Sequence, residues 1–255
     1  MARAILVIAD IGGYTRFMKV HRINLAHAQH IVGRLLEAVI DGAGRAFKLA
    51  KLEGDAAFFY ATEPFDAADK KRALVSIREA FLRRRDEFSI NRLCTCDGCV
   101  QAEQLKLKFV AHVGEVAFQK VKRYTELAGV DVILVHRLLK NSVPVPEYVL
   151  MSEPLHETLA PALGAAATEL SEDLEGLGET RTYYVELDDI AGPHVVDVRP
   201  SFFAKFFGWL RMTWRSIPYF VGAKKACEGF GNMKLVMPPD PAKLRPSAMP
   251  PRNPD

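Results

Sequence analysis

Residues 6–18, LVIADIGGYTRFM, decide how the first part of the chain folds. The apolar run at 5–8 predicts a buried strand, and this strand ends at the carboxylate of Asp10. Two glycines follow and permit a tight turn, after which the spacing of apolar residues becomes helical. A charged side chain does not stabilise the end of a buried strand, whereas a metal ion bound through oxygen atoms usually has carboxylate ligands. Asp10 is therefore a candidate metal ligand, although an aspartate here could also cap the following helix.

A second aspartate lies at the tip of a predicted hairpin. In residues 46–62, two apolar runs flank an acid-Gly-Asp turn that contains Asp55, a pattern typical of two antiparallel strands. If this hairpin neighbours the first strand, Asp10 and Asp55 meet at one edge of the sheet. Together with the backbone carbonyl of Ile11, the two carboxylates would form a hard oxygen site suited to Mg²⁺ or Mn²⁺. Taken alone, Asp55 could equally be an ordinary turn residue.

Strand and helix patterns alternate along the rest of the chain. The order is strand, helix, strand, strand, helix, strand, strand, helix, which predicts an α/β (α+β) fold with one mixed sheet and helices packed against one face. Within 105–121 we expect two strands that meet around Gly114 and Glu115. The other predicted elements are helices over 14–39, 65–90 and 130–141 and strands over 147–152 and 180–187.

The overall composition is that of an ordinary globular protein. Of the 255 residues, 49% are hydrophobic and 25% are charged, and the formal net charge is +3. So small a net charge gives no reason to expect nucleic acid as a partner. We see no secretory signal and no segment that is apolar over the roughly 18 residues needed to span a bilayer. We therefore expect a cytoplasmic protein.

Three of the four cysteines are crowded into one short segment, CTCDGC, as Cys94, Cys96 and Cys99. Disulfides are rare in the reducing cytosol, and three thiolates at this spacing are typical of zinc ligands. We expect a structural Zn²⁺ with a fourth ligand from elsewhere, for which His112 and Cys227 are candidates. Three reduced thiols in a surface loop, or an iron–sulfur cluster, are the alternatives.

The histidines of the first helical segment show no ligand pattern. His27 and His30 are three residues apart without a partner acid, and His21 is unsuitably spaced from both. We expect all three to lie on a solvated helix face.

The composition changes after about residue 190, where aromatic and basic residues become frequent. The segment 201–217 is rich in phenylalanine and tryptophan interleaved with lysine and arginine. Such a helix can lie in a membrane interface, or it can cover an apolar patch of the domain or of a dimer mate, which its thin polar face favours. Single-stranded nucleic acid is a further alternative, which the nearly neutral chain disfavours. The proline-rich residues 236–255 are predicted to be disordered.

Four short motifs, in the same order, resemble those of the class III nucleotidyl cyclases. ADIGGYT at 9–15 is similar to the family's ADI-x-GFT strand end, and KLEGDAAFF at 51–59 is similar to its K-x-x-GD hairpin. VAHVGEV at 110–116 resembles the family's G-h-x-x-GE strand pair, and YTELAGVDVILVHRL at 124–138 resembles, less closely, the start of the next helix. The resemblance spans roughly residues 1–190 and implies a cyclase-like domain with a ferredoxin-like βαββαβ core.

This resemblance sets the expected domain organisation. We expect a class III cyclase-like catalytic domain over 1–190, an aromatic and basic extension over 191–235, and the disordered tail over 236–255.

The resemblance implies an adenylate cyclase-like activity, which converts ATP to 3′,5′-cyclic AMP and pyrophosphate by a two-metal mechanism. Asp10, Asp55 and the Ile11 carbonyl would hold the Mg²⁺ or Mn²⁺ ions. The resemblance also implies a homodimer, in which each site takes its aspartates from one subunit and its lysine and arginine from the other.

Three further residues match positions that contact the nucleotide in the family. Lys51 matches the lysine that accepts the adenine ring, and Glu126 stands where an aspartate normally accepts from the adenine amino group. Arg137 matches the arginine that stabilises charge on the transferring phosphorus. Ile133 replaces the asparagine that orients the ribose, and isoleucine cannot donate a hydrogen bond. We therefore expect reduced cyclase activity or, alternatively, an inactive cyclase fold that binds a nucleotide or another small molecule.

Overall fold

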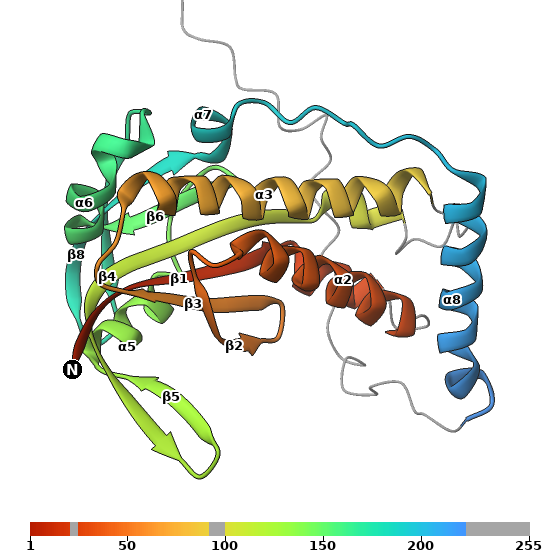
Figure 1. Ribbon diagram of the computed structural model, residues 1–255, viewed down its shortest axis with the longest axis horizontal. Coiled ribbons are helices and arrows are strands. Elements are labelled where there is room, and N and C mark those ends of the chain that lie inside the picture. Colours follow the sequence, from red (N-terminus) through yellow and green to blue (C-terminus); the bar gives the residue numbers. More distant parts are fainter. Residues whose placement is uncertain (21–24, 92–99, 223–255) are drawn as a thin grey trace, which may run out of the picture.

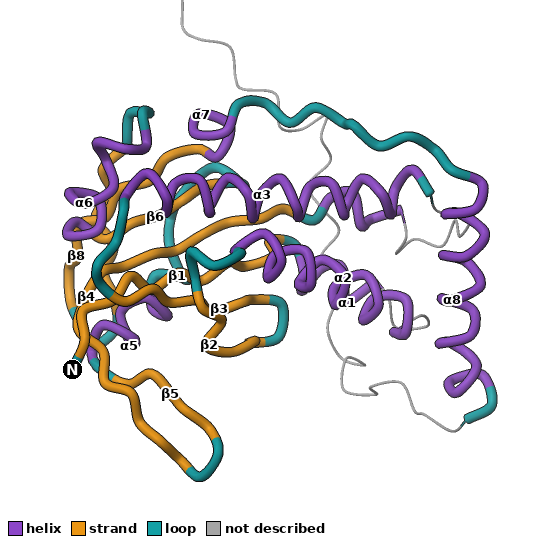
Figure 2. Tube along the Cα trace, in the orientation of Figure 1, coloured by secondary structure: helices purple, strands orange, loops and turns teal. Residues whose placement is uncertain are grey.

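The computed structural model describes residues 1–20, 25–91 and 100–222, which form one mixed sheet with helices on both faces (Figure 1, Figure 2). The strands are β1 (Ala2–Gly12), β2 (Lys48–Glu53), β3 (Ala56–Thr62), β4 (Lys106–Val121), β5 (Tyr124–Ala128), β6 (Tyr148–Ser152), β7 (Thr168–Leu174) and β8 (Gly178–Glu186). The helices are α1 (Tyr14–Val20), α2 (Leu25–Ala43), α3 (Ala67–Ile90), α5 (Val130–Arg137), α6 (Glu153–Leu163), α7 (Leu187–Ala191) and α8 (Phe202–Phe220), with a short 3₁₀ helix at Ala102–Gln104.

The sheet contains the predicted ferredoxin-like core. Its strand order is β2-β3-β1-β4-β6-β8-β7, and β5 pairs with the far end of β4. The pairs are antiparallel except for β4 with β6, so the sheet is mixed. The first four strands therefore follow the βαββαβ order, and the predicted α+β fold class is confirmed. The helices were predicted on one face only, but α5 covers the second face, where its apolar residues pack on the even-numbered side chains of β1.

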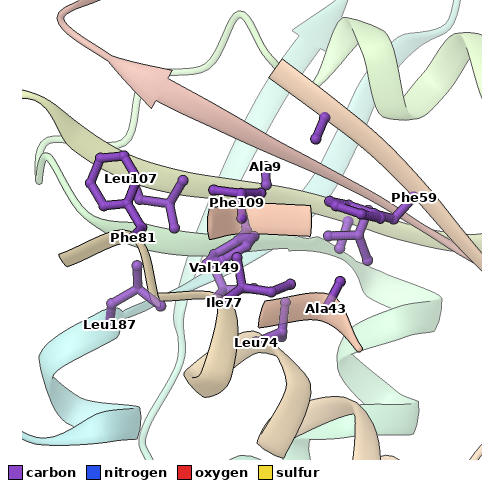
Figure 3. Close-up of a cluster of buried hydrophobic side chains, with 14 of the residues drawn as sticks. Ala9, Ala43, Phe59, Leu74, Ile77, Phe81, Leu107, Phe109, Val149 and Leu187 are labelled. Carbon is purple, nitrogen blue, oxygen red and sulfur yellow. The ribbon is translucent and has the colours of Figure 1, made fainter. Parts of the chain in front are cut away.

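Alternation along β1 divides its side chains between two hydrophobic cores. Ile5, Val7 and Ala9 face the core beneath α2, α3, α6 and α7, which Figure 3 shows in part. Leu6 and Ile8 face the opposite core, which α5 covers. Because side chains alternate along a strand, Asp10 lies on the α5 face of the sheet.

The prediction of two strands within 105–121 is wrong, because β4 continues through Gly114 as a single strand. Gly114 does not form a turn. The absence of a side chain at this position leaves space for Asp131 on α5. A Cβ atom at Gly114 would lie 2.2 Å from the carboxylate of Asp131 on α5. The reversal of the chain comes later, between β4 and β5, and this hairpin projects away from the sheet (Figure 1).

A strap of chain connects the sheet to α8, and it runs beside α3 (Figure 1). The buried side chain of Arg78 on α3 donates to the Gly192 carbonyl at 2.9 Å and to the carboxylate of Asp188. Farther along α3, the Asp86 carboxylate lies 2.6 Å from the Nε2 of His194. These contacts hold residues 188–194 against α3.

Two expectations from the sequence lie outside the described residues. Cys94, Cys96, Cys99 and Cys227 are among the residues that are not described, and so is the tail 236–255. Within the described part of the chain, no helix is both long and apolar enough to cross a membrane.

Candidate functional site

The fold brings Asp10 and Asp55 together at one edge of the sheet, as the sequence predicts. The Ile11 amide donates to the carbonyl oxygen of Asp55 at 3.3 Å, which ties the end of β1 to the β2–β3 turn. In an antiparallel strand, the N–H and C=O groups of one residue lie on the same side. The Ile11 carbonyl therefore lies on the side of β1 that carries Asp55.

The two carboxylates influence each other electrostatically. Burial and the nearby negative charge of Asp10 raise the pKa of Asp55 to about 6. The same negative field reaches Tyr14, where burial and the Asp55 charge raise the pKa of the phenol. A divalent cation between the two aspartates would remove this repulsion, because it neutralises both charges at once.

A lysine that the sequence analysis did not single out completes this edge of the sheet. Lys108 on β4 stands opposite Asp10 in the strand register, and its Nζ lies 3.1 Å from the Asp10 carboxylate. The only sequence signal was the LKLK alternation at the start of β4, which places Lys106 and Lys108 on one face.

An open cavity of about 400 Å³ adjoins these residues. The residues that line it include Gly12, Gly13, Lys106, Lys108, Asn141 and Tyr148. The Tyr148 hydroxyl donates to Asn141 Oδ1 at 2.9 Å. Lys106 is paired with Glu147 at 3.4 Å and Lys108 with Asp10, so the two lysines could bind a polyanion such as a polyphosphate by exchanging these partners.

Lys51 does not contact the aspartates of its own chain. Its Nζ lies 2.8 Å from the Glu53 carboxylate, which also lies 3.0 Å from His136 Nε2 on α5. Burial would raise the pKa of Glu53, but the hydrogen bonds from Lys51 and His136 outweigh it and lower the pKa. The His136 ring also packs edge-on against Phe58, with the ring centroids 4.9 Å apart. Glu53 thus fixes the position of Lys51 relative to α5.

The other predicted nucleotide-binding residues also lie apart from Asp10. Arg137 pairs with Glu175 in the turn between β7 and β8. Glu126 is exposed on β5, in the hairpin that projects from the sheet (Figure 1). Ile133 is 52% exposed on α5 and does not enter the core, whereas the neighbouring Val135 is buried.

A buried polar network anchors the start of α5. His112 on β4 places Nδ1 at 2.7 Å from Ser152 Oγ and Nε2 at 3.0 Å from Asp131 Oδ1. Asp131 also accepts a hydrogen bond from the Glu115 amide at 2.6 Å. Burial lowers the pKa of His112 despite the nearby Asp131 carboxylate. Both ring nitrogens of His112 are thus engaged, which argues against His112 as the fourth ligand of the expected cysteine site.

The expectation for the helix histidines is corrected at one position. His30 is buried, and its ring lies edge-on to Phe88 of α3, so it belongs to the α2–α3 interface and not to a solvated face. The side chains of His21 and His27 lie outside the described part of the structure. In the described ranges, no group of three or more His, Cys, Asp or Glu side chains could hold a metal ion. A metal ion at Asp10, if the prediction holds, would be held by two carboxylates and a backbone carbonyl.

Sequence comparison identifies one well-covered relative. An uncharacterized protein from Mycobacterium tuberculosis (strain ATCC 25618 / H37Rv), Rv2561/Rv2562, is 44% identical over 213 residues, which cover 84% of this chain and 100% of the relative. A family model described as a protein of unknown function (DUF2652) matches residues 32–148.

Solved structures of cyclase domains share the fold. Adenylate cyclases from Trypanosoma brucei match with a TM-score of 0.53 and 17% identity, over 78% of this chain and 96% of theirs. The guanylyl cyclase domain of the RhoGC fusion protein from the aquatic fungus Blastocladiella emersonii matches with a TM-score of 0.51 and 14% identity, over 72% of this chain and 96% of that one. The predicted cyclase-like fold is thereby confirmed, and both kinds of nucleotidyl cyclase share it.

Proposed function

The chain belongs to the family of the uncharacterized Mycobacterium tuberculosis protein Rv2561/Rv2562. From its cyclase-like fold and from the pairing of Asp10 with Asp55, we propose that it is a divergent, metal-dependent nucleotidyl cyclase. The proposed substrate is ATP, and the products are 3′,5′-cyclic AMP and pyrophosphate. The observation that carries the proposal is the meeting of Asp10 and Asp55, where the pKa of Asp55 is raised to about 6.

The residues at this edge fit Mg²⁺ or Mn²⁺. Asp10, Asp55 and the Ile11 carbonyl are hard oxygen donors, and a cation between the two carboxylates would offset the repulsion that contributes to the raised pKa of Asp55. When bound, the ions would lower the pKa of the attacking ribose hydroxyl and neutralise charge on the phosphates. Lys108 and Lys106 would bind the phosphates from the adjoining cavity.

The remaining site residues would come from a second subunit. Arg137 is held by Glu175 and Lys51 by Glu53, so neither faces the aspartates of its own chain. In a homodimer, Lys51 and Glu126 of one subunit would bind the base, and Arg137 would stabilise the charge that develops on phosphorus.

Product formation tests the proposal. Purified protein is incubated with Mn²⁺ and ATP or GTP, and the products are separated and identified. We expect 3′,5′-cyclic AMP from ATP and a loss of product in Asp55→Ala. If wild type forms no more product than Asp55→Ala at any protein concentration, the proposal fails.

A second candidate function is supported by Ile133. Loss of a donor that supports the transition state typically costs about two to three orders of magnitude in rate. Such a loss would leave a cyclase fold that binds a nucleotide without turnover. Ile133 is 52% exposed on α5, so Ile133→Asn is expected to fold normally. A large gain in turnover would favour the enzyme, and nucleotide binding without any turnover would favour the binding module.

A further inference from the structure

Helix α8 has an unusually apolar surface for the outside of a protein. At 3.6 residues per turn, seven apolar residues fall within one arc of about 140°. These seven residues are Phe202, Phe203, Phe206, Phe207, Leu210, Trp214 and Ile217. We refer to them as the aromatic face of α8. Each of the seven is at least 42% exposed, and Phe203 and Trp214 are 71% and 73% exposed.

The way in which α8 is attached explains this exposure. Its N-terminus is fixed to the end of α3, where the Ser201 amide donates to Asn91 Oδ1 at 3.0 Å. The helix contacts α2 and stands across the ends of α2 and α3 (Figure 1). Lys205 and Gly208, which lie outside the aromatic arc, are partly buried. The helix therefore turns a polar and small side toward the protein and its aromatic face toward solvent.

The charge of this region has a single sign. Between Asp197 and Glu228 the sequence contains six basic residues and no acidic residue, although the whole chain carries a formal charge of only +3. Three of the six, Lys205, Arg211 and Arg215, occupy positions of α8 outside the aromatic arc. Bulky aromatic side chains on one side of a helix and cations on the other are the combination that holds a helix in the plane of an anionic bilayer surface.

We propose that α8 docks the protein on an anionic lipid surface, with its aromatic face inserted among the headgroups and Arg211, which is exposed and borders that face, near the lipid phosphates. A second copy of the chain is a less suitable occupant. The exposed apolar residues of α5 and the β4–β5 hairpin lie at the other end of the molecule (Figure 1). The aromatic face is therefore not continuous with the surface that the proposed homodimer would use, and a second copy would bring cations against cations.

The two tryptophans of the chain both lie on α8, Trp214 on the aromatic face and Trp209 beside it, so their emission reports on insertion of this face. Full-length protein is mixed with vesicles of phosphatidylcholine alone, or of an equal mixture of phosphatidylcholine and phosphatidylglycerol. We expect a blue shift of tryptophan emission and co-sedimentation with the mixed vesicles. High salt should weaken both, because it shortens the Debye length from about 10 Å at 0.1 M to about 3 Å at 1 M.

Two double variants test whether vesicle binding depends on the aromatic face or on exposed apolar side chains in general. Phe203→Ser with Phe207→Ser should lower the partition into mixed vesicles roughly tenfold or more, because two large apolar side chains are lost from the inserted face. Val195→Ser with Val196→Ser removes two exposed apolar side chains just before α8 and should leave binding unchanged. Circular dichroism and thermal melting establish that both variants fold like wild type.

Three results would overturn the proposal. The first is wild-type protein that neither sediments with the mixed vesicles nor changes its emission. The second is a phenylalanine double variant that binds as well as wild type. The third is a dimer in the absence of lipid that this variant dissociates, which would assign the aromatic face to a second copy. Because cyclase activity is not measured, failure here is distinct from failure of the proposed function.

Discussion

At the scale of single residues, the two aspartates of the proposed metal site have different surroundings. Asp10 has Lys108 at 3.1 Å, whereas the pKa of Asp55 is raised to about 6 by burial and by the charge of Asp10. A carboxylate with a raised pKa makes the folded state bind its proton more tightly than the unfolded state does. The ionised Asp55 carboxylate therefore destabilises the folded state above pH 6. This effect disappears below pH 3.8, the ordinary pKa that the group has in the unfolded chain.

This difference predicts how stability depends on pH without divalent ions. As the pH rises from 4 to 7, ionisation of Asp55 should lower the free energy of unfolding by at most about 3 kcal/mol. Because Asp55 is only partly buried, solvent screening makes the decrease smaller than this limit. Asp55→Asn should remove this contribution and melt at a higher temperature than wild type at pH 7. Thermal melting of both proteins over this pH range, without metal, measures the difference. Equal pH dependence in the two proteins would contradict the prediction.

Wild type and Asp55→Asn also test the metal site without an activity assay. Mn²⁺ should raise the melting temperature of wild type at pH 7 and have little effect on Asp55→Asn, because one of two carboxylate ligands is lost. Glu63→Gln, which removes an exposed carboxylate on another surface, is the matched control and should respond like wild type. A Mn²⁺ response that Asp55→Asn retains would place the ion elsewhere.

The choice of nucleotide should depend on Glu53, although this residue is not expected to touch the base. Glu53 holds Lys51 at 2.8 Å and connects it to His136 on α5. Glu53→Ala should free the Lys51 side chain and lower the preference for ATP over GTP several-fold. The measurement is the ratio of kcat/KM for the two nucleotides. An unchanged ratio with reduced stability would indicate that Glu53 acts only in folding.

At the scale of elements, the contact between β4 and α5 depends on Gly114, which has no side chain. Asp131 occupies the space beside Gly114, where it accepts from the Glu115 amide and approaches His112. Gly114→Ala should therefore destabilise the protein by about 1–3 kcal/mol through overpacking. The cost should be much smaller in an Asp131→Ala background, because the clash is gone.

Chemical denaturation of wild type, the two single variants and the double variant gives this coupling as a double-mutant cycle. Additive effects would mean that Gly114 is required by the strand itself and not by Asp131.

The same element shows what a sequence pattern can and cannot predict. The β1 strand, the hairpin of β2 and β3, and α3 were predicted because their apolar periodicity is strong and local. In β4, glycine signals a turn or a close approach equally well, and only the tertiary structure reveals that Asp131 is the neighbour. The strand β7, TELSEDL, was missed because its acidic residues obscure the alternation. Likewise, Asp10 and Asp55 were predicted as a pair, whereas Lys108 becomes evident only from its register with Asp10.

At the scale of the whole molecule, one face of the sheet carries apolar residues that its own chain leaves exposed. Phe118, Val130 and Ile133, on the β4–β5 hairpin and α5, are 44–62% exposed. Clusters of this kind are typical of protein–protein interfaces. This face also carries Lys51 and Arg137, which need a second chain to reach a pair of aspartates under the proposed function.

A homodimer of this kind predicts that two inactive variants restore each other. Asp55→Ala lacks a metal ligand and Arg137→Ala lacks the transition-state cation, so each alone should be inactive. A mixed dimer has one site with both defects and one site with neither, because each site takes its aspartates and its arginine from different subunits. Random mixing makes half of the dimers mixed, so the mixture should regain about a quarter of wild-type activity. No recovery, with mixed dimers shown to form, would place all the site residues in one chain.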